Sequence, residues 1–202
     1  YMVDSRSASI GTALLIREAV KLRDAGVNVS DIAAACTEMS KYIKLTAVVG
    51  SLKYLKMGGR LSGAAAFAGT MLHITPVVSI ENQENLEVRQ LEVVDVEVED
   101  GKVVVIGKTR GKKAAEKLMH DKLIKDGLSL TRDFMFGHIN CSESLETFIN
   151  KSLTYISDVN GNVGVSSIGC SVGTHVGPGT YGIAYVEAAE SGMNRESIVK
   201  TA

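Results

Sequence analysis

The sequence predicts a chain that combines α/β and α+β structure in two successive parts. In the first part, patterns with helical spacing are followed by a short apolar run, an alternation that is typical of α/β folds. The second part contains strict alternation of apolar and charged residues and an Asp-Gly turn, which favour antiparallel strands. We therefore expect residues 1–46 to be the end of a parallel-sheet N-terminal domain. Residues 47–202 should form a C-terminal α+β domain with a mixed or antiparallel sheet and helices.

The first part is expected to alternate between strands and helices. Its start looks like the end of a strand in mid-fold, so we expect further residues upstream. Serines at N-cap positions begin the helices, and glycines such as Gly26, Gly58 and Gly59 end them. The expected elements are a strand at 1–4, a helix that opens at Ser5–Ser9 and runs to about residue 24, a helix capped by Ser30, a strand at 45–49, a helix at 52–57 capped by Ser51, a helix of small residues at 64–72 and a strand at 77–80.

The second part contains antiparallel signals and two longer helices. Val94, Val96 and Val98 alternate with acidic residues, which predicts a half-exposed strand. Asp100-Gly101 then predicts a hairpin turn. The remaining elements are expected as a strand at 102–106, a helix at 112–126, a strand at 134–139, a helix at 142–156 and strands at 163–168 and 181–186 around a glycine-rich turn.

The composition excludes several classes of function. A net charge of -1 and the absence of Trp give no reason to expect nucleic acid or an anionic membrane as the main partner. Cys36, Cys141 and Cys170 form no Cys-x-x-Cys pair, so we expect buried, reduced thiols in a cytoplasmic protein rather than zinc or disulfides. The sequence contains no Walker A glycine loop and no metal-ligand spacing of its histidines. We therefore expect no cofactor and no metal.

Serines gather where the first strand passes into the first helix. The segment Val3-Asp4-Ser5-Arg6-Ser7-Ala8-Ser9-Ile10-Gly11 combines hydroxyls with the free N–H groups of a first helical turn. Such a place suits an anion because the dipole end is positive. The plainer interpretation is that one of these serines is only an N-cap.

A second segment ends a short helix with two glycines and a cation. In Leu52-Lys53-Tyr54-Leu55-Lys56-Met57-Gly58-Gly59-Arg60, the glycines permit a sharp left-handed exit from the helix. Arg60 would then be a fixed cation beside a tight turn. A simple helix stop with a solvated Arg60 is the alternative.

A third segment is a basic cluster at a helix start, Lys108-Thr109-Arg110-Gly111-Lys112-Lys113. Cations at that end oppose the helix dipole. The cluster is therefore a solvated face, which is the usual case, or a docking surface for an acidic partner.

The fourth segment is a glycine-rich stretch around one histidine, from Gly169 to Gly182. Glycines let the backbone approach a ligand closely, and a histidine held there can donate to a carboxylate. Asp4, Ser5 and His175 are also the three residue types of a hydrolase triad. However, Ser5 does not stand in a Gly-x-Ser-x-Gly elbow, so that motif does not support this triad.

Taken in order, these segments resemble the DegV family. The opening Asp-Ser-x-x-x-Ser-x-Gly matches residues 4–11, and Leu-x-Tyr-Leu-Lys-x-Gly-Gly-Arg matches residues 52–60. A following Leu-x-Ile-x-Pro matches residues 72–76, and Gly-x-His-x-Gly-Pro-Gly matches residues 173–179. The resemblance covers nearly the whole chain.

The resemblance implies a two-domain α/β protein that binds one long-chain fatty acid, such as palmitate, and performs no catalysis. In bacteria such proteins are the lipid-binding subunit of a fatty acid kinase, and we also expect peripheral membrane contact during lipid exchange. The carried-over carboxylate residues are Ser5, Ser9, Arg60 and His175. The small-residue helix would line an apolar tunnel, and the basic cluster would face the kinase. The tunnel residues are Ala65, Phe67, Ala68 and Met71, and the partner-facing residues are Arg110, Lys112 and Lys113.

The sequence departs from the family pattern in two places that bear on function. The early Ser/Thr-Gly segment that should supply a carboxylate-binding Thr is absent, and the chain between Pro76 and Gly101 is longer than usual, with an acidic stretch of unassigned role. Two further hypotheses stay open at this point. One is a Ser-dependent acyl esterase or acyltransferase that uses the same pocket, and the other is a structural or regulatory module without a small ligand.

Overall fold

The computed structural model describes residues 1–60, 74–80, 103–127, 132–155 and 161–188. The strands of these residues form one mixed sheet in the order β3-β2-β1-β6-β4-β5. Strands β4 and β5 are parallel, and every other neighbouring pair is antiparallel. The strands are β1 (Ile43–Val48), β2 (Thr75–Ile80), β3 (Val104–Thr109), β4 (Phe134–His138), β5 (Val163–Ser167) and β6 (Tyr181–Val186).

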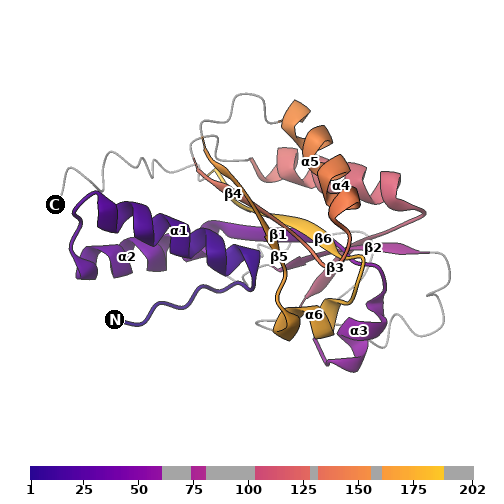
Figure 1. Ribbon diagram of the computed structural model, residues 1–202, viewed down its shortest axis with the longest axis horizontal. Helices are drawn as coiled ribbons and strands as arrows, with labels where there is room; N and C mark the ends of the chain where they lie inside the picture. Colours follow the sequence, from indigo (N-terminus) through magenta and orange to yellow (C-terminus); the bar gives the residue numbers. More distant parts are fainter. Residues whose placement is uncertain (61–73, 81–102, 128–131, 156–160, 189–202) are drawn as a thin grey trace.

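Helices cover both faces of this sheet, and a short pair lies at one end (Figure 1). On one face lie α1 (Ile10–Asp24) and α2 (Val29–Met39), which a 3-10 turn (Ser40–Tyr42) connects to β1. On the other face lie α4 (Lys112–Asp126) and α5 (Ser142–Tyr155). The short helices α3 (Leu52–Met57) and α6 (Cys170–Val176) pack against each other at the lower end of the view in Figure 1. The mixed α/β class predicted from the sequence is thereby confirmed.

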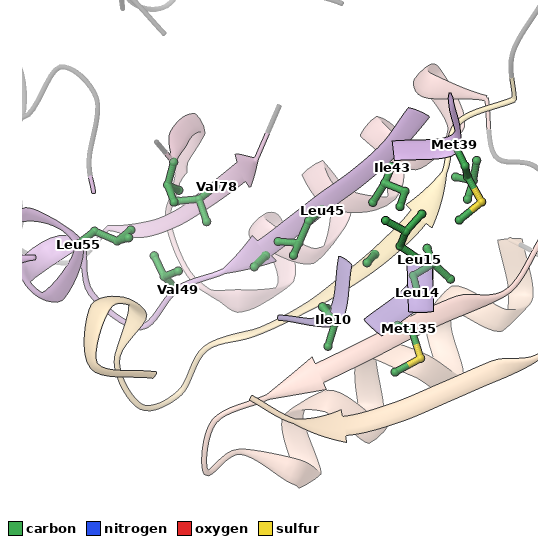
Figure 2. Close-up of a cluster of buried hydrophobic side chains, with 14 of the residues drawn as sticks. Ile10, Leu14, Leu15, Met39, Ile43, Leu45, Val49, Leu55, Val78 and Met135 are labelled. Atoms are coloured by element: carbon green, nitrogen blue, oxygen red, sulfur yellow. The ribbon is translucent and has the colours of Figure 1, made fainter. Parts of the chain in front are cut away.

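The alternation of side chains along the strands produces two hydrophobic cores. On β6, Tyr181, Ile183 and Tyr185 face α4 and α5, whereas Ala184 and Val186 belong to the core under α1 and α2. Figure 2 shows the second of these cores, with Ile10, Leu14 and Leu15 of α1 directed toward β1 and β4. The buried face of α1 thus fixes the position of its N-terminus, which carries the serine segment.

A cluster of ion pairs also attaches α1 to the start of β4. Asp133, whose side chain is 3% exposed, accepts from Arg17 Nε at 3.1 Å and from Lys21 Nζ at 2.5 Å. Asn162 donates its backbone N–H to the same carboxylate at 2.9 Å, and Glu18 pairs with Arg132 nearby. Burial by itself would raise the pKa of Asp133, but the hydrogen bonds and charges of Lys21, Asn162 and Arg17 lower it below its usual value. The carboxylate is therefore ionised and ties α1 to the edge strand β5.

Several predicted boundaries are wrong by a few residues for local reasons. Residues 1–4 form no strand. Asn28, not Ser30, caps α2, since its side chain accepts from the Asp31 N–H at 3.0 Å. Ser51 caps α3 as predicted, with its hydroxyl accepting from Lys53 N. The expected strand at 94–98 and the Asp100-Gly101 turn lie outside the described residues.

The sequence predicted a turn for the glycine-rich stretch, but the stretch contains the helix α6. Gly169 is the N-cap and Gly177, with φ 77°, is the C-cap, so the glycines bracket the helix rather than break it. Only Gly173 lies within the helix. His175 consequently lies in the last turn of α6, where backbone geometry holds it more firmly than a loop would.

The described residues of the first part do not pack as a separate unit. Strand β1 lies in the middle of the sheet between β2 and β6, and α1 shares its core with Met135 and Ala184. The assignment of residues 1–46 and 47–202 to two domains of a longer protein stays a prediction. None of the helices seen in the described parts of the chain is both long and apolar enough to cross a membrane.

Candidate functional site

The serine segment before α1 forms a tight loop held together by its own hydroxyls. Ser5 Oγ donates to the Ser7 carbonyl at 3.1 Å and lies 3.1 Å from Thr12 Oγ1, which itself donates to the Ser7 carbonyl at 3.2 Å. Ser9 is the N-cap residue of α1 but makes no capping hydrogen bond with its side chain. The plain N-cap interpretation therefore does not account for Ser9.

Backbone strain concentrates in the same loop. Arg6 and Ser9 have φ values of 48° and 50°, in the left-handed region that non-glycine residues rarely adopt. Such a conformation costs on the order of 1 kcal/mol or more per residue and occurs often at ligand-binding sites. The loop is thus shaped against the intrinsic preference of its residues.

Ser7 contributes a buried oxygen that the sequence analysis did not single out. Among the described side chains, Ser7 Oγ is a buried polar atom with no hydrogen-bond partner. An unsatisfied buried hydroxyl costs about 1–3 kcal/mol, so it is a place where a ligand atom would restore a bond. Gly11 makes room for it, because a Cβ there would lie 2.0 Å from Ser7 Oγ. In the sequence, the only sign of this contact is that a glycine follows Ser7 four positions later.

The two signature segments that end in glycines contact each other through α3 and α6. The His175 ring covers Gly58 at the end of α3, where a Cβ would lie 2.2 Å from His175 Nδ1. Reciprocally, the Tyr54 ring covers Gly177 at the end of α6, where a Cβ would lie 2.3 Å from Tyr54 Cδ2. Each helix therefore ends in a glycine that accommodates an aromatic ring from the other helix.

Arg60 is brought to the same place as His175. Its Nη1 donates to the Gly58 carbonyl at 2.7 Å, and Gly59, with φ 67°, provides the left-handed turn that the sequence predicted. Arg60 and His175 thus both adjoin Gly58, although they lie far apart in the chain. A cation and an imidazole beside one backbone turn are suitable partners for an anion.

The serine loop and α6 lie at the same end of the sheet. A Cβ at Gly137, near the end of β4, would lie 2.7 Å from Ile10 Cγ2 and 3.1 Å from Ile168 Cγ1. Ile10 begins α1, and Ile168 leads into α6, so both segments meet the carboxyl end of β4. That Ser5 and His175 reach one carboxylate stays a prediction. The expected tunnel residues Ala65, Phe67, Ala68 and Met71 lie outside the described residues.

The basic cluster is fully on the surface. Lys108, Arg110, Lys112 and Lys113 are exposed, and Lys112 Nζ donates to Ser144 Oγ of α5 at 3.0 Å. Exposure suits a docking surface and a solvated face equally, so the role of these residues stays a prediction.

The Ser-His-Asp arrangement of a hydrolase finds no support in this geometry. The Ser5 hydroxyl donates to the Ser7 carbonyl, and Asp4 is exposed and accepts from the Arg6 backbone N–H at 2.9 Å. A nucleophilic serine would need a base as its hydrogen-bond acceptor, with a carboxylate behind that base.

A second polar cluster, not anticipated from the sequence, lies between α4 and α5. His120 is 5% exposed, stacks on Phe148 with ring centroids 5.0 Å apart, and lies with Nε2 2.9 Å from Ser152 Oγ. Because Ser152 donates its own proton to the Phe148 carbonyl, Nε2 must donate to Ser152. Desolvation lowers the pKa of His120, against the attraction of nearby Glu116. The neutral ring is the form that fits this place, beside an open cavity of about 420 Å³ lined by His120, Thr147, Asn150, Lys151 and Thr154.

Comparison with curated proteins identifies relatives along most of the chain. A DegV domain-containing protein of Clostridium acetobutylicum is 30% identical over 193 residues, which is 91% of this chain and 58% of that protein. Another, from Caldanaerobacter subterraneus, is 27% identical over 190 residues. The chain thus spans about 60% of the length of the curated relatives that it matches.

Solved structures with the same fold include several lipid-binding proteins. A DegV lipid-binding protein from Thermotoga maritima superposes with a TM-score of 0.73 at 24% identity, and covers 94% of this chain and 60% of its own. The Streptococcus pneumoniae fatty acid kinase B3 protein, loaded with linoleic acid, has a TM-score of 0.74 at 18% identity, and the match covers 93% of this chain and 60% of that protein. At these identities the likeness establishes the fold.

A protein-family model described as "Uncharacterised protein, DegV family" matches residues 1–92 and 93–188. These matches include the serine loop, the α3 segment with its paired glycines and the α6 segment with its histidine. The chain belongs to the DegV family.

Proposed function

We propose that the protein binds one long-chain fatty acid and presents it to a fatty acid kinase, without performing catalysis itself. The observation that supports this most directly is the meeting of the α3 and α6 segments around Gly58. Arg60 and His175 each adjoin Gly58 there, and the serine loop with Ser5, Ser7 and Ser9 meets the same end of the sheet. Proteins of the same fold have been crystallised with linoleic acid and heptadecanoic acid.

The energetics of such a ligand divide between its two ends. Burying about 15 methylene groups at ~0.8 kcal/mol each gives roughly 12 kcal/mol before the costs of association, so the acyl tail supplies affinity. The carboxylate cannot enter a dry site without partners. Ser5, Ser9, Arg60 and His175 are the proposed partners, and Ser7 is added because its buried oxygen lacks one.

The presentation to a kinase is the more specific part of the proposal. It is supported by the fold shared with the Streptococcus pneumoniae fatty acid kinase B3 protein and by the exposure of Arg110, Lys112 and Lys113. The compartment we propose is the cytoplasm, because all three cysteines are free thiols, as is usual in a reducing environment.

Mass spectrometry of lipid extracted from the purified full-length protein tests the ligand. We expect a long-chain fatty acid at about one molecule per protein, and less of it in the His175→Ala variant. Preparations that contain no fatty acid, and that acquire none on incubation with palmitate, would contradict the proposal. Acyl-ester turnover that disappears in Ser5→Ala would instead favour the esterase or acyltransferase alternative.

A further inference from the structure

Thr12, in the first turn of α1, contacts the serine loop from one position beyond the motif that ends at Gly11. Its Oγ1 donates to the Ser7 carbonyl at 3.2 Å and lies 3.1 Å from Ser5 Oγ. The Ser5 hydroxyl donates to the same carbonyl at 3.1 Å. One backbone oxygen therefore accepts from two hydroxyls that also contact each other.

The Ser5 hydroxyl has a single proton, and the bond to the Ser7 carbonyl already engages it. The oxygen of Ser5 is engaged as well, because it accepts from the Ser7 N–H at 3.4 Å. To donate to a ligand, Ser5 has to withdraw its proton from the part-buried Ser7 carbonyl. An acceptor left unpaired in such a place offsets much of what the new bond to the ligand would gain.

The Ser7 carbonyl depends on these two hydroxyls. In the part of the chain that the structure describes, no backbone N–H donates to it, because the Gly11 N–H at this helix start bonds instead to the Ala8 carbonyl at 3.0 Å. Without the Thr12 hydroxyl, Ser5 would be the remaining described donor to the Ser7 carbonyl. A ligand would then compete with that carbonyl for the Ser5 proton.

We propose that Thr12 is a positioning residue, which holds the Ser7 carbonyl and so frees the Ser5 hydroxyl for the ligand carboxylate. A carbonyl oxygen has two lone pairs, so both hydroxyls can share it before binding. When Ser5 turns its proton to the carboxylate, the bond from Thr12 keeps the carbonyl paired. The inference rests on the proposed function, since it assumes that Ser5 binds a carboxylate.

Titration of the full-length protein with a fluorescent fatty acid tests this role. Thr12→Val keeps the shape of the side chain but lacks its hydroxyl, and should weaken binding about five- to tenfold. Thr12→Ser restores the hydroxyl and should bind as the wild type does. The matched control is Thr37→Val, which removes a threonine hydroxyl that donates to a backbone carbonyl of α2, and it should also bind normally. Urea unfolding verifies that each variant is folded.

A double variant shows whether Thr12 acts through Ser5. In the Ser5→Ala background, Thr12→Val should cause no further loss of affinity, because no Ser5 proton remains to be freed. An equal loss in both backgrounds would overturn the inference and make Thr12 a structural residue of the loop.

The same titrations separate this inference from the proposed function. If Thr12→Val binds as well as the wild type while Ser5→Ala binds less, Thr12 has no positioning role and the ligand assignment stands. If Ser5→Ala binds as well as the wild type, Ser5 is not a carboxylate residue and the inference falls with that assignment. A wild-type protein that binds no fatty acid would overturn the proposed function itself, and the inference with it.

Discussion

At the scale of single residues, the proposed carboxylate site combines hydroxyl and imidazole donors from distant segments of the chain. Ser5→Ala and His175→Ala should each weaken fatty-acid binding by at least about tenfold, because each lost donor to a buried carboxylate costs about 1.5–3 kcal/mol. The two effects should be non-additive, as for neighbours around one ligand group. Titration with a fluorescent fatty acid measures them. Ser166→Ala, which changes an exposed hydroxyl on β5, is the matched control.

Ser7 allows a sharper form of this test. Its buried oxygen has no hydrogen-bond partner among the residues that the structure describes, so Ser7→Ala should leave stability unchanged or raise it, while weakening fatty-acid binding. Urea unfolding without ligand and binding titration measure the two effects. Lower stability together with unchanged binding would remove Ser7 from the site.

The contact between Gly58 and His175 can be tested with one methyl group. In Gly58→Ala the new Cβ would lie 2.2 Å from Nδ1, so the ring must move and fatty-acid affinity should fall about as far as in His175→Ala. The double variant should bind no worse than His175→Ala alone, because the clash is then gone. Gly169→Ala, which meets open space, should bind normally. Additive losses in the double variant would show that Gly58 acts independently of the ring.

At the scale of elements, the α4–α5 contact should respond to pH. The fold lowers the pKa of His120 from 6.5, so the folded state favours the neutral ring and the unfolded state takes up the proton first. The stabilisation is therefore present above pH 6.5 and is lost as the pH falls below it. Urea unfolding between neutral and mildly acidic pH should show this loss in the wild type but not in His120→Gln, which can still donate to Ser152. If the unfolding free energies of the wild type and His120→Gln change with pH in parallel, the role given to His120 is contradicted.

The stability that the Asp133 cluster contributes should be lost at a lower pH than the stability of the α4–α5 contact. Because the folded pKa of Asp133 is depressed below 3.8, its contribution is complete above that value and is lost as the pH falls through the folded pKa. At neutral pH, Asp133→Asn should cost about 1–3 kcal/mol of unfolding free energy, since two cations lose a buried partner but are themselves partly exposed. Asp24→Asn, at an exposed pair on the same helix, should cost little. Equal losses in both variants would contradict the importance of the Asp133 cluster.

The sequence predicted elements well where local signals act alone. Lys112–Asp126 and Tyr181–Val186 have the predicted bounds, and Ser51 caps α3, because spacing and capping are read from neighbouring residues. The stretch around His175 was interpreted as a turn because its glycines suggest a broken backbone. Packing of α6 on α3 overrides that preference, and no local pattern reveals such a partner. The clusters of Asp133 and His120 were missed for the same reason, since their members come from separate elements.

At the scale of the whole molecule, the basic cluster and the proposed lipid site occupy different parts of the fold. Arg110 follows β3 and Lys112 begins α4, whereas His175 lies at the α3–α6 end. Arg110→Glu/Lys112→Glu should therefore reduce acyl-phosphate formation with the kinase while fatty-acid binding stays unchanged. Kinase assays at limiting kinase, beside a binding titration, make the comparison. Unaffected acyl-phosphate formation would mean that the cluster only keeps the protein in solution.

The paired contacts at the ends of α3 and α6 have a consequence for how the sequence can evolve. Tyr54 fills the space that Gly177 leaves, and His175 fills the space that Gly58 leaves. A side chain at either glycine would therefore require a smaller ring on the opposite helix. Each segment thus sets the residues that the other can tolerate, and the two should change together or not at all. Chimeras between distant family members should accordingly keep their fold only when both segments come from the same parent.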